Sequence, residues 1–270
     1  MEQNTHRRFQ ICLIELEKIN DTLSELYLDS NNLYNHKIGI FKIFRKLVIN
    51  LRFMYETSEV SSQQITLSLG RMIIDHYSIL YLLSTHSSRK EQLLRYYLYL
   101  IDSLQSRINT IQDFSSNFSE MSEEILKNNE ISNSHDQNVV IKLKEFIFEN
   151  KLNDIANEKD LENSNWKFVS SHPAKKNVYS WQELYNISKI PEHFSKAIQN
   201  HFSTFTHGLG MTILYSEDNP ESTLYVYEFV TLIQALIGKM MLLNYPEELK
   251  NLELRQDFLD SGEAGWNDWK

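Results

Sequence analysis

The chain has 270 residues, of which only seven are glycine and four are proline, and it contains a single cysteine, Cys12. So few turn-forming residues disfavour a β-rich or βαβ protein, and one cysteine excludes an intramolecular disulfide framework or a multi-cysteine metal site. The formal net charge of −9 argues against a protein whose whole surface binds nucleic acid, although it leaves room for a local basic patch.

The N-terminal residues and the most apolar stretch predict where the protein resides. Residues 1–4 lead into a charged segment without an apolar signal core, so we expect a cytoplasmic location. The most apolar stretch, residues 224–243, is interrupted by Glu228, Gln234 and Lys239. Because a membrane span needs about 20 predominantly apolar residues, we expect no transmembrane segment.

Helical periodicity dominates the first half of the chain. Apolar residues recur at three- and four-residue spacings over long stretches, which is typical of helices that bury one face. A polar stretch over residues 128–137, rich in Asn and Ser, predicts a loop. The predicted helices cover residues 5–28, 35–55, 61–84, 89–126 and 139–148.

The second half of the chain contains local signals for the beginnings and ends of helices. Residues 150–180 are the least regular part and are expected to form an irregular linker or insertion. Ser180 and Glu183 have the spacing of a capping box, which predicts that a helix begins there. Pro191 suits the first turn of a further helix, which ends before Gly208.

Pro220 predicts the first turn of the last helix. This helix is strongly apolar over residues 221–243 and ends before Pro246. An acidic tail follows at residues 257–270. Together these signals predict one all-α domain that spans all 270 residues, a multi-helix bundle around a central buried helix.

The predicted helix over residues 61–84 is apolar on most of its circumference, which is typical of a helix in the centre of a bundle. An unpaired guanidinium or carboxylate there would cost several kcal/mol, so we expect Arg71 and Asp75 to pair. The polar residues of this helix form one narrow seam that consists of Gln64, Ser68, Arg71, Asp75 and Ser78.

Arg71 and His76 are the first candidates for chemistry. A histidine with a pKa near neutrality can accept the proton of a 2′-hydroxyl, and an arginine can stabilise the charge that develops on a phosphate. The pair therefore suits metal-free RNA cleavage, although residues five apart on an ideal helix point about 140° apart. The alternative is a core His76 beside an Arg71–Asp75 pair that fixes the register of the helix.

The second candidates are Ser203 and His207, which share one polar line on the helix that ends before Gly208. If this helix packs against the central one, both side chains meet Arg71 and Asp75 in one cluster. The alternative is that His207 interacts with the last carbonyls of its own helix, which favour a cation. Ser203 lacks the strand–turn–helix elbow of a hydrolase nucleophile.

A basic helix is the third feature. Residues 30–55 contain no acidic residue, and their basic side chains gather opposite an apolar face. On a chain of net charge −9, such a patch suits RNA phosphates, an anionic membrane surface or an acidic protein partner. The alternative is a solvated face balanced by acids elsewhere in the fold. The patch consists of Lys42, Arg45, Lys46 and Arg52.

The sequence offers no pattern for a metal or a nucleotide cofactor. It contains neither a G-x-G-x-x-G motif nor a P-loop. Asp75 beside His76 is not a metal site by itself, and no cluster of ligands at metal spacing accompanies it. We therefore expect neither a metal nor a cofactor.

Two short helical signatures accompany these candidates. They are Leu69-Gly70-Arg71-Met-Ile-Ile-Asp75 and Ser203-Thr-Phe-Thr-His207-Gly208, the second preceded by Trp166 and Tyr185. Over about a third of its length, the chain thus resembles a group of bacterial all-helical proteins related to abortive-infection and HEPN-like families. The resemblance implies an α-helical bundle, a role in phage defence or toxin-like RNA cleavage, and a site completed across a homodimer.

The leading hypothesis is an HEPN-like bacterial defence protein that acts as a metal-independent ribonuclease or toxin-type effector. Arg71 would stabilise phosphate charge, and His207 or His76 would act as acid and base. Asp75 and Ser203 would orient these groups. The alternative is a non-catalytic helical interaction module with a structural Arg–Asp–His cluster. RNA or an acidic protein would bind its basic helix, or a partner would bind the Trp-containing tail at residues 257–270.

Overall fold

The structure is a computed structural model that describes residues 2–58, 62–117, 122–169, 178–197 and 220–260. Its described residues are helical apart from connecting segments and one isolated antiparallel bridge between Phe168 and Val178, which confirms the predicted all-α class. Contacts between residues divide the chain into two compact units. Unit 1 comprises residues 1–86 and 180–270, and unit 2 comprises residues 87–179. The single-domain expectation stays a prediction, since contacts alone do not test whether each unit folds by itself.

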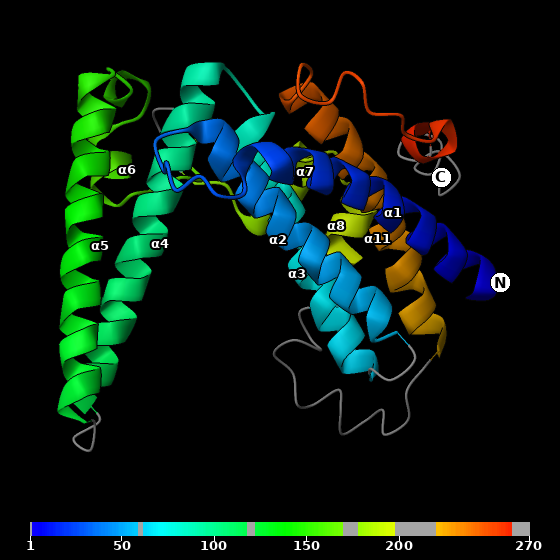
Figure 1. The fold of residues 1–270 in the computed structure, drawn as a ribbon, viewed down its shortest axis with the longest axis horizontal. Coiled ribbons are helices and arrows are strands. Elements are labelled where there is room, and N and C mark those ends of the chain that lie inside the picture. The colour runs from blue at the N-terminus through cyan, green and yellow to red at the C-terminus, as the bar shows by residue number, and fades with distance from the viewer. Residues whose placement is uncertain (1, 59–61, 118–121, 170–177, 198–219, 261–270) are drawn as a thin grey trace. The chain divides into compact units, whose positions relative to one another are not determined.

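Four long helices of unit 1 form a closed ring (Figure 1). Helix α1 contacts α2 and α11, and α3 contacts the same two helices from the other side of the ring. The short helix α7 packs on α3, and α8 packs on α7. The bounds are Glu2–Tyr27 for α1, His36–Glu56 for α2, Gln63–Ser84 for α3, Trp181–Ile187 for α7, Glu192–Ala197 for α8 and Pro220–Asn244 for α11.

Local capping explains where several of these helices begin. The side chain of Asn35 accepts hydrogen bonds from the backbone N–H groups of Lys37 and Ile38 at the start of α2. Both bonds of the capping box between Ser180 and Glu183 form at the start of α7, as the sequence predicted. Pro220 is the first residue of α11, which agrees with its expected place in the first turn.

Helix α3 is buried less evenly than the sequence suggested. Ile73, Ile74 and Tyr77 are buried, but Ile65 is 48% exposed and His76 is only half-buried. Within the described residues, α3 contacts α2, α11 and α7. The apolar circumference of α3 is therefore largely covered by these three helices, whereas Ile65 lies on a side that stays exposed.

Helix α11 is the most apolar element. By length and composition alone, residues Thr223–Asn244 could cross a membrane, but 72% of the most apolar window is buried inside the structure. Glu228 accepts a hydrogen bond from Thr5 Oγ1 of α1 at 3.1 Å, and Gln234 is fully buried. Burial against α1 and α3 therefore accounts for the apolar sequence of α11.

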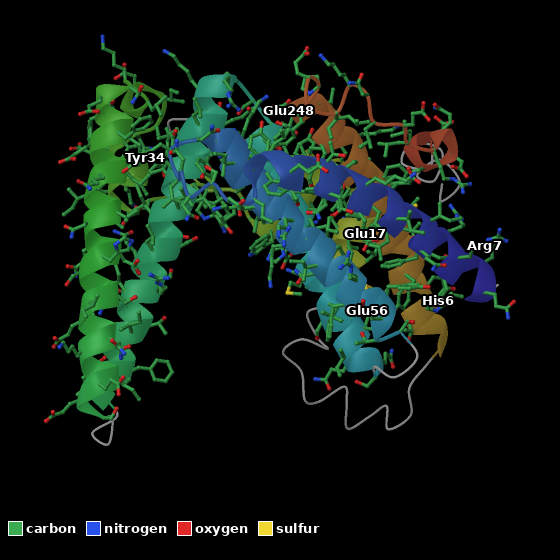
Figure 2. All side chains as sticks on the ribbon, viewed as in Figure 1. His6, Arg7, Glu17, Tyr34, Glu56 and Glu248 are labelled. Carbon is green, nitrogen blue, oxygen red and sulfur yellow. The ribbon has the colours of Figure 1, made fainter. Side chains whose placement is uncertain are left out.

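Residues after α11 return to α1 and α2. The carboxylate of Glu248 (Figure 2) accepts hydrogen bonds from Tyr27 of α1 at 2.6 Å and from Lys37 of α2 at 2.7 Å. Burial and the neighbouring Glu248 raise the pKa of Tyr27 to about 12. Further on, the backbone N–H of Arg255 donates to the buried carboxylate of Glu15 at 3.1 Å. The C-terminal segment is thus attached to the ring by carboxylate hydrogen bonds.

Unit 2 corrects two sequence-based boundaries. Helix α5 (Glu123–Glu149) includes residues 128–137, so the predicted loop there is wrong, and α4 (Arg89–Asn117) ends before the predicted residue 126. Helices α4 and α5 lie side by side in Figure 1. Arg107 of α4 binds the buried Asp136 of α5 through Nε at 2.6 Å. This contact stabilises helical structure in a polar stretch whose composition favours a loop.

The irregular stretch at residues 150–169 folds against α4. It contains the 3₁₀ helix η1 (Asn153–Ile155) and the short helix α6 (Glu158–Glu162). Arg95 of α4 is fully buried and donates to the carbonyl of Trp166 at 3.0 Å. Its guanidinium also pairs with Glu91 and lies 4.0 Å from the centre of the Phe168 ring. Burial lowers the pKa of Arg95, and Glu91 opposes that effect by stabilising the charged form.

A close approach between Gly238 and Phe258 gives a stability prediction. A Cβ atom at Gly238 would lie 2.5 Å from Cζ of Phe258, whose side chain is 1% exposed. Alanine normally stabilises a helix interior by about 1 kcal/mol relative to glycine. We expect Gly238→Ala instead to lower the free energy of unfolding by about 1–3 kcal/mol through overpacking, as measured by urea denaturation.

Phe258→Leu provides the control for this effect. In the double variant, the smaller side chain makes room for the new methyl group, so the two substitutions should couple by about 1 kcal/mol or more. Strict additivity of the two single effects would contradict the packing explanation.

Candidate functional site

The predicted pair of Arg71 and Asp75 forms on α3. Nε of Arg71 donates to both carboxylate oxygens of Asp75, at 3.0 Å to Oδ1 and 3.1 Å to Oδ2. The two residues are one helical turn apart, a spacing that brings side chains together. Their side chains are 13% and 24% exposed, so the pair is partly buried.

Tyr185 of α7 contacts both members of this pair. Its hydroxyl donates to Oδ1 of Asp75 at 2.5 Å, and the Arg71 guanidinium lies 5.3 Å from the centre of its ring. Burial, followed by the charge of Asp75, raises the pKa of Tyr185 above its ordinary value, and Arg71 opposes the shift. The phenol therefore stays protonated at neutral pH and acts as a donor.

Two further hydrogen bonds connect α3 to the end of α7. The hydroxyl of Tyr77 donates to the carbonyl of Ser188 at 2.6 Å, and the hydroxyls of Ser78 and Ser188 lie 3.0 Å apart. Ser78 was expected in the polar seam, and it is buried here. We refer to these residues as the α3–α7 cluster, which consists of Arg71, Asp75, Tyr77, Ser78, Tyr185 and Ser188.

His76 contacts a different neighbour. Its Nδ1 lies 3.3 Å from Nδ2 of Asn50 on α2, whereas Arg71 and Asp75 contact α7. Burial lowers the pKa of His76, Asp75 opposes the shift, and Lys46 adds to it. The imidazole is therefore neutral at pH 7. Because α3 presents Arg71 and His76 to different helices, the structure shows no contact between them within its described residues.

Ser203 and His207 lie outside the described residues. The structure therefore does not test whether they meet Arg71 and Asp75. The role of Tyr185, in contrast, was not predicted from the sequence, where this residue only precedes the Ser203–His207 signature. The capping box at Ser180 placed it on a helix, but no local pattern indicated that its hydroxyl would reach Asp75.

Two of the four residues in the predicted basic patch on α2 contact side chains of α1. Nε of Arg52 pairs with Glu17 at 2.7 Å, and Arg45 donates to the hydroxyl of Ser24 at 3.2 Å. Glu17 is labelled on α1 in Figure 2. The hydrogen bond and charge of Glu17 raise the pKa of Arg52 above its ordinary value. Part of the patch is thus balanced by α1, as one of the alternatives anticipated.

The remaining lysines share the surface of α2 with exposed apolar side chains. Ile49 is 46% exposed and Phe53 is 50% exposed, while Lys46 is exposed and Lys42 is half-buried. At 100° per residue these four side chains fall within a sector of about 60°. We call this surface the α2 face, and it consists of Lys42, Lys46, Ile49 and Phe53. Sequence analysis identified its lysines and missed its apolar residues.

No metal centre is evident in the parts of the chain that the structure describes, because no three His, Cys, Asp or Glu side chains converge there. The α3–α7 cluster contains one carboxylate, one guanidinium and hydroxyl groups. Such a set can hold helices together or bind an anion through arginine, but it is not a ligand set for a metal.

The α3–α7 cluster predicts the effect of a conservative substitution. Tyr185→Phe removes one of the hydrogen bonds to Asp75 while leaving the ring in place. We expect the free energy of unfolding to fall by about 1–2 kcal/mol, because a partly buried carboxylate loses a donor. Urea denaturation measures this change. Tyr225→Phe, on a side chain that is 58% exposed, serves as the control, and an equal effect of both substitutions would refute the structural role.

Comparison of the chain with known protein families, with curated protein sequences and with solved structures found no match. The resemblance to abortive-infection and HEPN-like proteins therefore stays a prediction based on the two short signatures.

Proposed function

We propose that this chain is a non-catalytic helical interaction module that binds an acidic protein segment through the α2 face. The observation on which the proposal rests is the joint exposure of Ile49 and Phe53 beside Lys46 on one helical surface. An apolar centre flanked by charges is typical of a surface that binds another protein.

The apolar residues supply the affinity in this proposal. Ile49 and Phe53 are four residues apart, so their side chains are neighbours on the helix. Fully burying such a side chain contributes about 1.5–3 kcal/mol, and roughly half of each remains to be buried. An amphipathic partner helix with its own apolar residues at this spacing would cover both.

The charges favour an acidic protein over RNA. Arg45 and Arg52 already interact with Ser24 and Glu17 of α1. Lys42 makes a long, exposed hydrogen bond of 3.4 Å to Asn31, so both lysines remain placed to contact a partner. RNA affinity comes largely from many phosphate contacts, so a surface with two lysines around an apolar centre suits RNA poorly. Acidic residues at the edge of a partner helix would pair with Lys42 and Lys46.

The α3–α7 cluster supports a structural role for the Arg71–Asp75 pair. The Nε–H of Arg71 is shared between both oxygens of Asp75, and Oδ1 also accepts a hydrogen bond from Tyr185, so the carboxylate is held by groups from two helices. A carboxylate held in this way stabilises the attachment of α7 to α3.

A binding experiment with a defined peptide tests the α2 face. The probe is a fluorescent helical peptide with leucines at four-residue spacing and glutamates at the edges of that apolar stripe. We expect Phe53→Ser to weaken its binding about tenfold and Lys46→Glu about fivefold, as followed by fluorescence anisotropy.

Matched control substitutions lie on α4. Phe114 is 49% exposed and Lys90 is exposed, so Phe114→Ser and Lys90→Glu change the surface equally without touching α2. Both should leave peptide binding unchanged. Equal losses in the control variants, or tighter binding of a single-stranded RNA that is lost in Lys46→Glu, would overturn the proposal.

A metal-independent ribonuclease of HEPN-like type is the second candidate. It is favoured by the partial exposure of Arg71 and Asp75, at 13% and 24%, and by their contact with α7. The chain continues from α7 through α8 toward Ser203 and His207. In this candidate Arg71 would stabilise phosphate charge, His207 would act as acid or base, and a second copy of the chain would complete the site.

An RNA-cleavage assay in the presence of a chelator separates the two candidates. For the interaction module, we expect the wild type, His76→Ala and His207→Ala all to leave RNA intact. Cleavage by the wild type that disappears in a folded His207→Ala variant would overturn the module and favour the ribonuclease. Folding is checked by circular dichroism, which also guards against a loss of activity through unfolding.

A further inference from the structure

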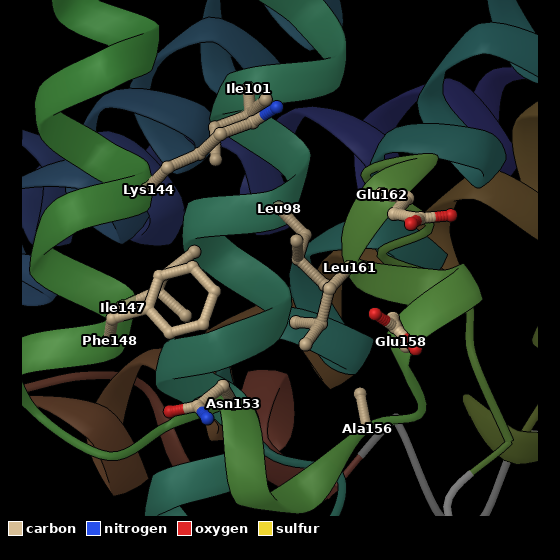
Figure 3. A pocket seen from close by; sticks show the side chains of 10 residues that line it. All are labelled: Leu98, Ile101, Lys144, Ile147, Phe148, Asn153, Ala156, Glu158, Leu161 and Glu162. Carbon is tan, nitrogen blue, oxygen red and sulfur yellow. The ribbon is translucent and has the colours of Figure 1, made fainter.

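Unit 2 contains an open pocket of about 520 Å³ (Figure 3). Helices α4 and α5 supply its long apolar walls, and η1, Ala156 and α6 close one side. Its volume lies within the range of small-molecule sites in proteins. The lining residues are Leu98, Ile101, Lys144, Ile147, Phe148, Asn153, Ala156, Glu158, Leu161 and Glu162.

The apolar part of the pocket is continuous. Leu98, Ile147 and Leu161 come from three different helices and meet around one space in Figure 3. Phe148 lies beside them and is 59% exposed, so an aromatic ring at the edge of the pocket is open to a ligand. These surfaces favour a ligand with an aromatic or aliphatic body.

The charged groups of the pocket are not evenly distributed. Glu158 and Glu162 are one turn apart on α6, and both are exposed. Lys144 comes from α5, and its side chain extends toward Ile101 (Figure 3). The α6 side of the pocket is therefore acidic, and a cationic group beside an apolar body would meet both carboxylates there.

We propose that this pocket binds a small primary amine with an aromatic or aliphatic body. The ammonium group would lie against Glu158 and Glu162, and the apolar body would lie on Leu98, Ile147 and Leu161. This inference does not depend on the α2 face, since it concerns residues of unit 2 alone.

A pair of probes tests the charge selectivity. Tryptamine and indole-3-propionate have the same ring and a chain of similar length, but one ends in an ammonium and the other in a carboxylate. We expect tryptamine to bind at least about fivefold more tightly, because the α6 side offers two partly solvated carboxylates. Methyl NMR spectra of the full chain should shift at Leu98, Ile101, Ile147 and Leu161.

Three variants complete the test. Glu158→Gln combined with Glu162→Gln should weaken tryptamine about fivefold and remove the preference over indole-3-propionate. Ala156→Trp should abolish binding by filling the edge of the pocket. Glu145→Gln, on an exposed side chain of α5 outside the pocket, should change nothing. Equal affinity for both probes, or shifts confined to methyl groups elsewhere, would overturn the proposal.

Discussion

A charge that leaves water inside a helical bundle has to be paired, and this requirement determines how the shorter segments of this protein attach to its long helices. Asp75 is held by Arg71 and by Tyr185, and this contact attaches α7 to α3. Glu15 accepts the backbone N–H of Arg255 and so attaches the C-terminal segment to α1. In each case a carboxylate of one long helix accepts a hydrogen bond from a segment distant in sequence, while its charged partner, Arg71 or Lys18, lies about one turn away on the same helix.

The same requirement separates structural polar groups from those available to a partner. The hydrogen bonds of Asp75 are made within unit 1, whereas Lys46 is exposed beside Ile49 and Phe53. A polar group inside the bundle is costly unless it is paired, and Asp75 finds its partners within the fold. The exposed apolar residues are the stronger indication of binding, because a large apolar side chain in water has affinity still to gain.

The two units offer surfaces of opposite charge. On α2, two lysines lie beside two exposed apolar side chains, and in the pocket of unit 2, Glu158 and Glu162 lie on the α6 side of apolar walls that Lys144 also borders. In both proposals, an apolar contact would supply the affinity and charge would select the ligand. The net charge of −9 does not reveal that basic and acidic side chains gather at different places, because it sums the charges over the whole chain.

The sequence by itself determined the helical class and most helix boundaries, because hydrophobic periodicity and local signals such as the capping box at Ser180 act within a few residues. It also predicted the Arg71–Asp75 pair, whose partners are one turn apart. Only the tertiary structure decided that Tyr185 joins the pair and that the stretch around Asp136 is helical. These outcomes depend on contacts across 110 and 29 residues of sequence, and no local pattern encodes which distant segments meet.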